Sequence, residues 1–149
     1  MLKLLFAMAS VMFLATQANA ACPIEKSTYS LAKNTEFSLA FNTLKEPKAW
    51  SALGLVLKTP SRTFAYEFTA SNGYETFFLV SLSPQGIEDD STSIYFFDKD
   101  LKTLALPQSG SNAPAYIFTP DLGQQLWYAS LEPREYLPTE MWRLDGCME

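Results

Sequence analysis

The sequence contains no histidine among its 149 residues. Histidine is the side chain whose unperturbed pKa lies closest to neutrality, so its absence excludes Ser-His-Asp and Cys-His nucleophilic machinery. It also removes the commonest ligand of zinc and copper sites. No glycine-rich phosphate loop, Gly-x-Ser-x-Gly motif or dinucleotide fingerprint occurs. We therefore predict no metal site, no cofactor and no recognisable catalytic residue, which leaves carboxylates, Ser-Lys pairs and tyrosines for any chemistry.

Basic residues are scarce. The 11 Lys and Arg residues oppose 16 Asp and Glu residues, which gives a net charge of −5. Nucleic acids and anionic membrane surfaces both favour clustered positive charge, and no long basic run occurs here. The composition therefore predicts an acidic soluble protein with no nucleic-acid partner.

A long apolar run occurs at the N-terminus, where it has the three parts of a secretory signal. Lys3 gives a short positive region, residues 4–15 are apolar or small, and Ala18-Asn19-Ala20 forms an Ala-x-Ala cleavage site. The run is too short for a membrane anchor, which takes about 20 residues, and no later segment is suitable for one. We expect residues 1–20 to be removed as a signal peptide. Residues 21–149 would then form a single β domain in the bacterial periplasm or outside the cell.

The chain has two cysteines, Cys22 and Cys147, at opposite ends of the expected mature domain. In an oxidising compartment such a pair predicts one disulfide that closes the whole domain. The alternative is lipid acylation of Cys22, because lipoprotein signals place a cysteine directly after the cleavage site. Ala20 and Ala21 fit that pattern, but Asn19 stands where a leucine is usual. The disulfide is the preferred interpretation, and a lipid-anchored protein is the alternative.

Period-two apolar patterns dominate the mature chain. Residues 37–41 alternate Phe, Leu and Phe with Ser and Ala, and Asn72-Gly73 is a strong hairpin signal between two such patterns. The predicted strands span residues 37–41, 53–57, 64–68, 76–82, 94–97, 101–106, 116–119 and 126–131. We predict an all-β fold, a single antiparallel β-sandwich or small barrel of about eight strands with meander-like hairpins.

Little helix is expected. Residues 46–53 and 138–142 are candidate helical turns, although residues 141–147 fit a closing strand equally well. Residues 98–100 and 120–123 carry turn chemistry. We therefore interpret Asp98, Asp100 and Asp121 as turn residues rather than as calcium ligands, because calcium takes six to eight oxygens. Residues 83–90 and 107–114 are predicted loops.

Glu67 and Glu75 flank the Asn72-Gly73 turn, and a tight hairpin would place them nearly opposite each other on adjacent strands. Glycoside hydrolysis uses two carboxyl groups about 5–10 Å apart. The pair therefore supplies the alternative function, a carboxylate-dependent enzyme that acts on a glycan. The simpler interpretation is that both residues face solvent on a half-exposed hairpin.

Aromatic residues are abundant, with 3 Trp, 7 Tyr and 11 Phe. Most must fill the core, but an exposed ring can stack on a sugar or anchor a protein partner. Trp50, Trp127 and Trp142 are the candidate binding residues, and on a strand either Trp127 or Tyr128 should point outward. With no catalytic residue recognised, we predict a non-enzymatic binding or accessory protein of the bacterial envelope, with a protein or glycan partner.

Overall fold

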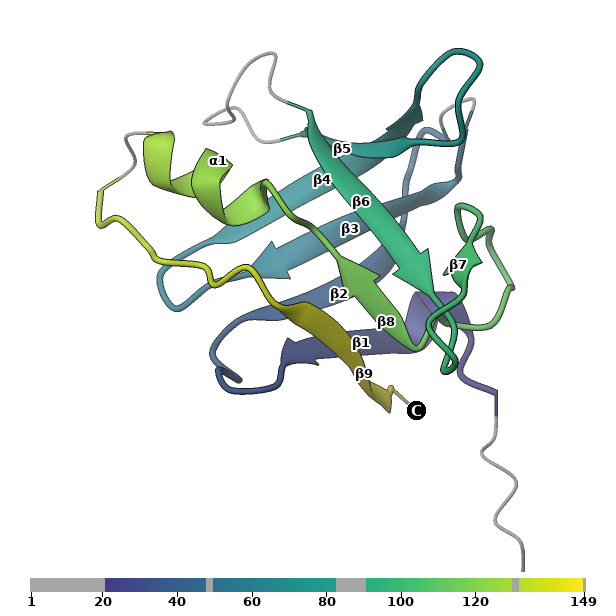
Figure 1. Ribbon diagram of the computed structural model, residues 1–149, viewed down its shortest axis with the longest axis horizontal. Helices are drawn as coiled ribbons and strands as arrows, with labels where there is room; N and C mark the ends of the chain where they lie inside the picture. Colours follow the sequence, from purple (N-terminus) through teal and green to yellow (C-terminus); the bar gives the residue numbers. More distant parts are fainter. Residues whose placement is uncertain (1–20, 48–49, 83–90, 130–131, 149) are drawn as a thin grey trace, which may run out of the picture.

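The computed structural model describes residues 21–47, 50–82, 91–129 and 132–148 (Figure 1). Within these residues the chain forms a nine-stranded antiparallel sheet. The strands are β1 (Ser27–Leu31), β2 (Ser38–Thr43), β3 (Leu53–Lys58), β4 (Thr63–Ala70), β5 (Phe77–Ser81), β6 (Thr92–Phe97), β7 (Thr103–Leu104), β8 (Tyr116–Phe118) and β9 (Met141–Cys147). A 3-10 turn, η1 (Ile24–Lys26), precedes β1, and a short helix, α1 (Leu122–Tyr128), separates β8 from β9.

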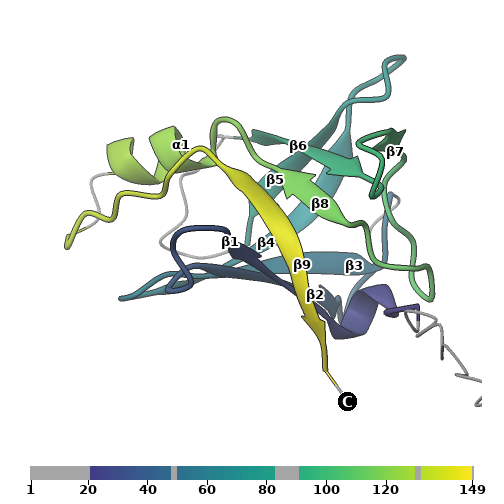
Figure 2. The same cartoon turned by 60° about the horizontal axis from the view of Figure 1, so that its bottom comes forward.

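The sheet closes on itself into a barrel (Figures 1 and 2). Its order is β5-β4-β3-β2-β1-β9-β8-β6-β7, and β5 also pairs with β6, where Phe77 lies opposite Ile94. Eight strands therefore form the closed wall, and β7 is an extra strand paired with the end of β6. Of the two predicted architectures, sandwich and barrel, the structure has the barrel.

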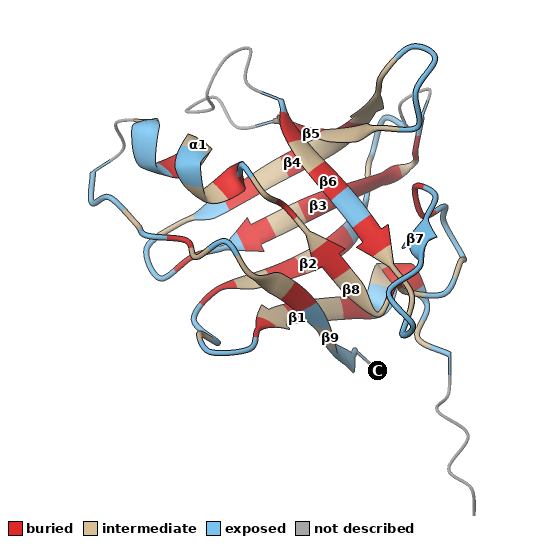
Figure 3. Cartoon of the chain, viewed as in Figure 1, coloured by how far each residue is buried: buried red, intermediate tan, exposed pale blue. Residues whose placement is uncertain are grey.

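Side chains fill the barrel interior. Buried and partly exposed residues alternate along the strands (Figure 3). On β4, the buried residues are Phe64, Tyr66 and Phe68. At the centre Phe41 packs against Tyr29, Phe68 and Phe96, with ring centroids 6.0 to 6.4 Å apart. An eight-stranded barrel is just wide enough for side chains to fill it. The inside of the wall is thus a hydrophobic core, and we look for binding sites at the ends of the barrel.

The strand connections alternate between two ends of the barrel. The disulfide end holds η1, both ends of the described chain and the connecting residues 44–47, 50–52, 71–76 and 98–115. The helix end holds residues 32–37, 59–62, 119–129, which include α1, and 132–140. Buried apolar side chains lie at both ends, Ile24 at the first and Leu122, Leu126 and Leu137 at the second.

Most predicted strands are confirmed, with boundaries shifted by one to a few residues. The Asn72-Gly73 hairpin joins β4 to β5, and Gly73 has the positive φ of 85° that such turns favour. The predicted strand at residues 101–106 shrinks to the two residues of β7. Sequence reasoning missed β1, whose inward residues are Ser27, Tyr29 and Leu31, because only two of the three are apolar.

The predicted strand at residues 126–131 is wrong, since residues 122–128 form α1. Leu122 and Leu126 lie four residues apart, so one helix face buries both. Gly123 lets the helix approach closely, because a Cβ there would collide with the carbonyl oxygen of Leu137. This packing outweighs the strand preference of the adjacent Trp and Tyr. The turn expected at residues 120–123 leads directly into the helix.

Neither candidate helical turn is seen in the described residues. Leu53 begins β3, and residues 46–47 and 50–52 are not helical. Met141 begins β9, so the closing-strand interpretation of residues 141–147 is confirmed. Residues 48–49, the predicted loop at 83–90 and the predicted signal peptide at 1–20 lie outside the described residues.

Candidate functional site

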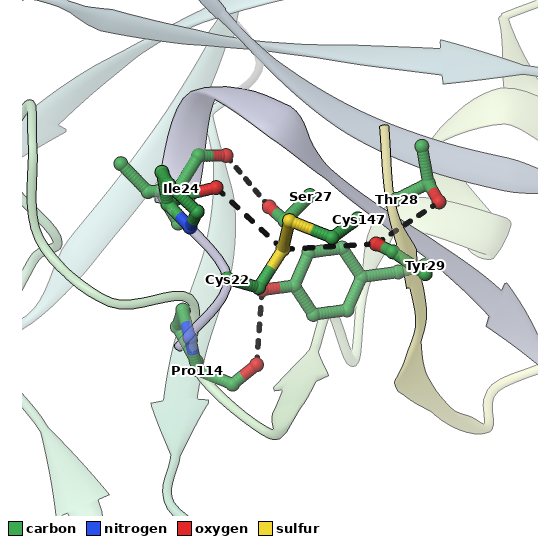
Figure 4. The surroundings of a disulfide bond; sticks show 9 residues. Cys22, Ile24, Ser27, Thr28, Tyr29, Pro114 and Cys147 are labelled. Atoms are coloured by element: carbon green, nitrogen blue, oxygen red, sulfur yellow. Dashed lines mark hydrogen bonds between the residues drawn. A yellow bond between two sulfur atoms is a disulfide. The ribbon is translucent and has the colours of Figure 1, made fainter. Parts of the chain in front are cut away.

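Cys22 and Cys147 form a disulfide whose Cα atoms lie 5.6 Å apart, across a sequence separation of 125 residues (Figure 4). The register of β1 and β9 brings them together, because Ser27 lies opposite Cys147. This bond fits an extracellular or periplasmic protein. It also competes with the lipoprotein alternative, since a lipid thioether would use the same sulfur of Cys22. In the described part of the chain, no helix has the length and apolar character needed to cross a bilayer.

Hydrogen bonds hold the segments around the disulfide. The Tyr29 hydroxyl donates to the Pro114 carbonyl at 3.0 Å, and burial raises the pKa of this phenol (Figure 4). The Glu25 carboxylate accepts hydrogen bonds from the Ser109 hydroxyl and from the Gly110 amide, the latter at 2.7 Å. These bonds lower the pKa of Glu25, the Ser109 contact most. The N-terminal segment is therefore joined to the long connection between β7 and β8.

The three predicted tryptophans have different environments. Trp142 is 1% exposed, and its indole Nε1 donates to the Thr119 hydroxyl at 3.0 Å. It therefore belongs to the core and cannot contact a ligand on the surface of this fold. Trp50 is 48% exposed at the disulfide end, and Trp127 is 39% exposed at the helix end. The structure thus leaves two of the three residues available for binding and places them at opposite ends.

Trp50 lines a pocket of about 300 Å³, which we call the Trp50 pocket. The β4–β5 hairpin supplies the other walls, with Tyr74 80% exposed at its tip. The pocket is lined by Trp50, Ala70, Ser71, Asn72, Gly73, Tyr74, Glu75 and Phe77. Two hydrogen bonds shape the hairpin tip: the Ser71 hydroxyl donates to the Tyr74 carbonyl, and the Ser71 amide donates to the Thr76 carbonyl at 3.0 Å. The pocket therefore combines aromatic rings with an amide and a carboxylate.

A second pocket of about 330 Å³, the Trp127 pocket, lies at the helix end. Its walls are α1 and the segment before β9, and its lining is Gly123, Gln124, Trp127, Tyr136, Leu137 and Thr139. Tyr136 is 75% exposed. The Arg134 guanidinium lies over the Trp127 ring, 5.5 Å from its centroid, and also pairs with Glu132 at 3.3 Å. Contact with Arg134 restrains the indole ring through a cation–π interaction.

Polar contacts join the segment before β9 to the β3–β4 turn. The Glu135 carboxylate accepts a hydrogen bond from the Ser61 amide at 2.7 Å, and the Arg62 guanidinium donates to the Glu132 carbonyl. Partial burial by itself would raise the pKa of Glu135, but hydrogen bonds from Ser61 and Thr59 and the charge of Arg62 lower it overall. The helix end is thus held by noncovalent contacts.

The expected facing pair of Glu67 and Glu75 is wrong. On β4, Glu67 lies opposite Val80 of β5 and Gly54 of β3. Three cross-strand pairs separate it from the hairpin loop: Phe68–Leu79, Thr69–Phe78 and Ala70–Phe77. Glu75 lies outside the strands, in the hairpin connection, and lines the Trp50 pocket. The residue opposite Glu67 is therefore five positions beyond Glu75 along the chain. The enzymatic alternative therefore loses the geometry on which it depended.

Asp98 is a turn residue, as predicted. Its Oδ1 accepts hydrogen bonds from the amides of Asp100 and Lys102 at 2.8 and 2.9 Å. Among the residues that the structure describes, no group of three or more His, Cys, Asp or Glu side chains could hold a metal ion.

A wider groove of about 820 Å³ runs beside the disulfide. Small residues make much of its lining, including Ala113, Ala115 and Gly146, and none of its described lining residues is aromatic. It lacks the stacking surfaces that distinguish the two tryptophan pockets.

Sequence reasoning missed Tyr74 and Tyr136 as pocket residues. Tyr74 carried a usable signal, because it follows the Asn72-Gly73 turn directly and so lies at a hairpin tip, away from the core. Comparisons with protein-family models, with curated proteins and with solved structures found no match to this chain. The case for function therefore depends on the geometry of the pockets.

Proposed function

We propose that this protein is a non-enzymatic, glycan-binding module of the bacterial envelope, and that the Trp50 pocket is its binding site. The observation that carries the proposal is the half-exposed ring of Trp50 beside the exposed ring of Tyr74, with polar groups in the same hollow. Aromatic side chains gathered in a hollow with a few polar groups are typical of ligand-binding sites.

The pocket chemistry matches a sugar ring. A pyranose has C–H faces that pack on aromatic rings and hydroxyl groups around its edge. Trp50 and Tyr74 offer the aromatic surface, while the Asn72 amide and the Glu75 carboxylate are suited to bind hydroxyl groups. A volume of about 300 Å³ is at the lower end for small-ligand sites and is large enough for one sugar unit.

A binding role is favoured over a catalytic one. Glu75 is the one acidic residue among the described lining residues of the Trp50 pocket. Hydrolysis of a glycosidic bond uses two carboxyl groups on either side of the bond. With Glu67 placed on β4 opposite Val80, this pocket supports sugar recognition better than hydrolysis.

The test is titration of the protein with a panel of soluble oligosaccharides, including cellotetraose, chitotetraose and fragments of peptidoglycan glycan. Replacing Trp50 by Ala should weaken binding at this pocket by at least about tenfold, as removal of a central aromatic anchor does. Tyr128→Ala is the matched control, because Tyr128 is an exposed aromatic residue that lines neither pocket. Wild-type affinity together with an unchanged number of bound oligosaccharides per chain in Trp50→Ala, or no binding to any member of the panel, would contradict the proposal.

We further propose that the protein reaches the periplasm or the exterior after cleavage behind Ala20 and stays free of lipid. Intact mass of the protein from cells tests both points. The expected species lacks residues 1–20 and gains the mass of two hydrogen atoms on reduction. A species that carries the mass of acyl chains at Cys22 would contradict the free form and support the lipoprotein alternative.

A further inference from the structure

We infer that the Trp127 pocket is a second saccharide site, so that one barrel binds two glycan segments at its opposite ends. This inference rests on the proposed glycan-binding function and extends it from one site to two.

The two pockets share the same chemical plan although their sequences are unrelated. Each has a partly exposed Trp beside a largely exposed Tyr, Trp50 with Tyr74 and Trp127 with Tyr136. Each adds a side-chain amide, from Asn72 in one pocket and Gln124 in the other. The volumes are also similar, about 300 and 330 Å³. A ligand class that suits one pocket therefore suits the other.

Core packing and a cation–π contact hold the walls of the Trp127 pocket. Its two walls meet where Gly123 of α1 contacts the Leu137 backbone, and Leu122, Leu126 and Leu137 anchor both walls in the core. Arg134 over the indole restrains the ring that a sugar would stack on. Restraint of this kind lowers the entropic cost of binding. The polar groups that would meet hydroxyls are the Gln124 amide and the Thr139 hydroxyl.

The distance between the pockets determines whether one short ligand can reach both of them. They lie at opposite ends of a barrel whose longest strand, β4, has eight residues. At a rise of about 3.3 Å per residue, that strand is roughly 25 Å long. We therefore expect a tetrasaccharide to occupy one pocket at a time, so that each pocket binds its own chain or its own stretch of one polymer. A two-site barrel can therefore bridge glycan strands and gain avidity on a polymer.

The experiment counts sites with a short ligand and measures bridging with a long one. The wild-type protein, Trp127→Ala/Tyr136→Ala, Trp50→Ala/Tyr74→Ala and the control Tyr128→Ala are titrated calorimetrically with the tetrasaccharide that binds best. Light scattering then follows each protein mixed with a soluble polymer of the same sugar, glycol chitin or hydroxyethyl cellulose. Thermal melts check folding, and Tyr136→Ala alone serves if the double variant at the helix end is unstable, because this side chain is largely exposed.

We expect two tetrasaccharides per wild-type chain, one per chain in each double variant, and polymer bridging at least about tenfold weaker in both double variants. One tetrasaccharide per wild-type chain, lost on changing Trp50 and Tyr74 but not Trp127 and Tyr136, would overturn this inference and leave the proposed function standing. One per chain, lost only on changing Trp127 and Tyr136, would overturn both the two-site inference and the assignment of the Trp50 pocket. Absence of binding to every sugar would overturn the proposed function and this inference together.

Discussion

The two ends of the barrel present similar pockets but are held by different forces. At the disulfide end, the Cys22–Cys147 bond and the hydrogen bonds of Glu25 fix the termini and the long β7–β8 connection. At the helix end, packing of α1 and the contact between Glu135 and Ser61 do the equivalent work without a covalent bond. The comparison shows that the filled barrel supplies a common rigid base. Each pocket is held in shape by the contacts at its own end. A substitution at one end should therefore affect the pocket at that end most.

Loss of the disulfide should lower the stability of the protein more than any other change considered below. Replacing both Cys22 and Cys147 by Ser should lower the free energy of unfolding by up to about 5 kcal/mol, because the chain-entropy model gives this value for so long a loop. Urea unfolding of the variant, and of the wild type with and without reductant, measures the loss. In the double serine variant, we expect sugar affinity to fall more at the Trp50 pocket, which lies at the disulfide end, than at the Trp127 pocket. Equal loss at both ends would show that the ends are not independent.

Substitution of each tryptophan by alanine should show that Trp142 stabilises the fold much more than Trp50 or Trp127 does. Trp142→Ala should cost about 3–5 kcal/mol, because it empties a core site and leaves Thr119 without its indole partner. Trp50→Ala and Trp127→Ala should each change stability by less than about 1 kcal/mol, as surface substitutions usually do. Chemical denaturation of the three variants checks this order. A large loss in Trp50→Ala would mean that its ring supports the fold instead of a ligand.

Gly123→Ala should disturb the helix end selectively. The added Cβ collides with the Leu137 carbonyl, so α1 must shift away from that segment at a cost of about 1–3 kcal/mol. Gly146→Ala is the matched control at the disulfide end, because a Cβ there makes an ordinary contact of 3.8 Å with the Thr28 hydroxyl. Thermal unfolding and the two sugar-binding affinities would be measured. The comparison fails if Gly123→Ala weakens the Trp50 pocket as much as the Trp127 pocket.

The smallest changes in stability should come from replacing Glu25 or Glu135, and they should depend on pH. The pKa values of Glu25 and Glu135 are both lowered in the folded protein. Their contributions are therefore present above the unfolded pKa, near 4.3, and are lost as the pH falls through the lower folded pKa. Glu25→Gln and Glu135→Gln should each reduce stability at pH 7 by less than about 1 kcal/mol and make it fall less steeply in acid. Urea unfolding at a series of pH values measures both slopes, and a steeper fall in either variant would contradict the assignment.

The fold was largely predictable because its strands obey a local rule. Alternation of large apolar residues with small or polar ones, as in residues 37–41 and 64–68, reports which side chains face the core. The pairing of Cys22 with Cys147 was predictable for a similar reason, since two cysteines in an oxidised domain leave one choice. What failed was α1, where aromatic strand preference at Trp127 and Tyr128 hid the spacing of Leu122 and Leu126.

The candidate sites were less predictable because exposure is a tertiary property. Trp142 lies opposite Leu31 of β1 and Ile117 of β8, which are both buried, and residues directly opposite each other share a face of the sheet, so its ring points into the barrel. Trp50 precedes a strand and therefore stays at the rim of the barrel. Composition alone ranks these residues equally. The partners Tyr74 and Tyr136 become visible only when the hairpin tip and the segment before β9 have been placed in space.

The bond between Cys22 and Cys147 closes residues 22–147 into one covalent ring. A protease that cuts one loop inside this ring opens the circle but releases no fragment. The nicked chain keeps its strands together as one molecule. In the envelope, where we propose that the protein acts, a single proteolytic cut within the ring would create new chain ends without releasing part of the domain.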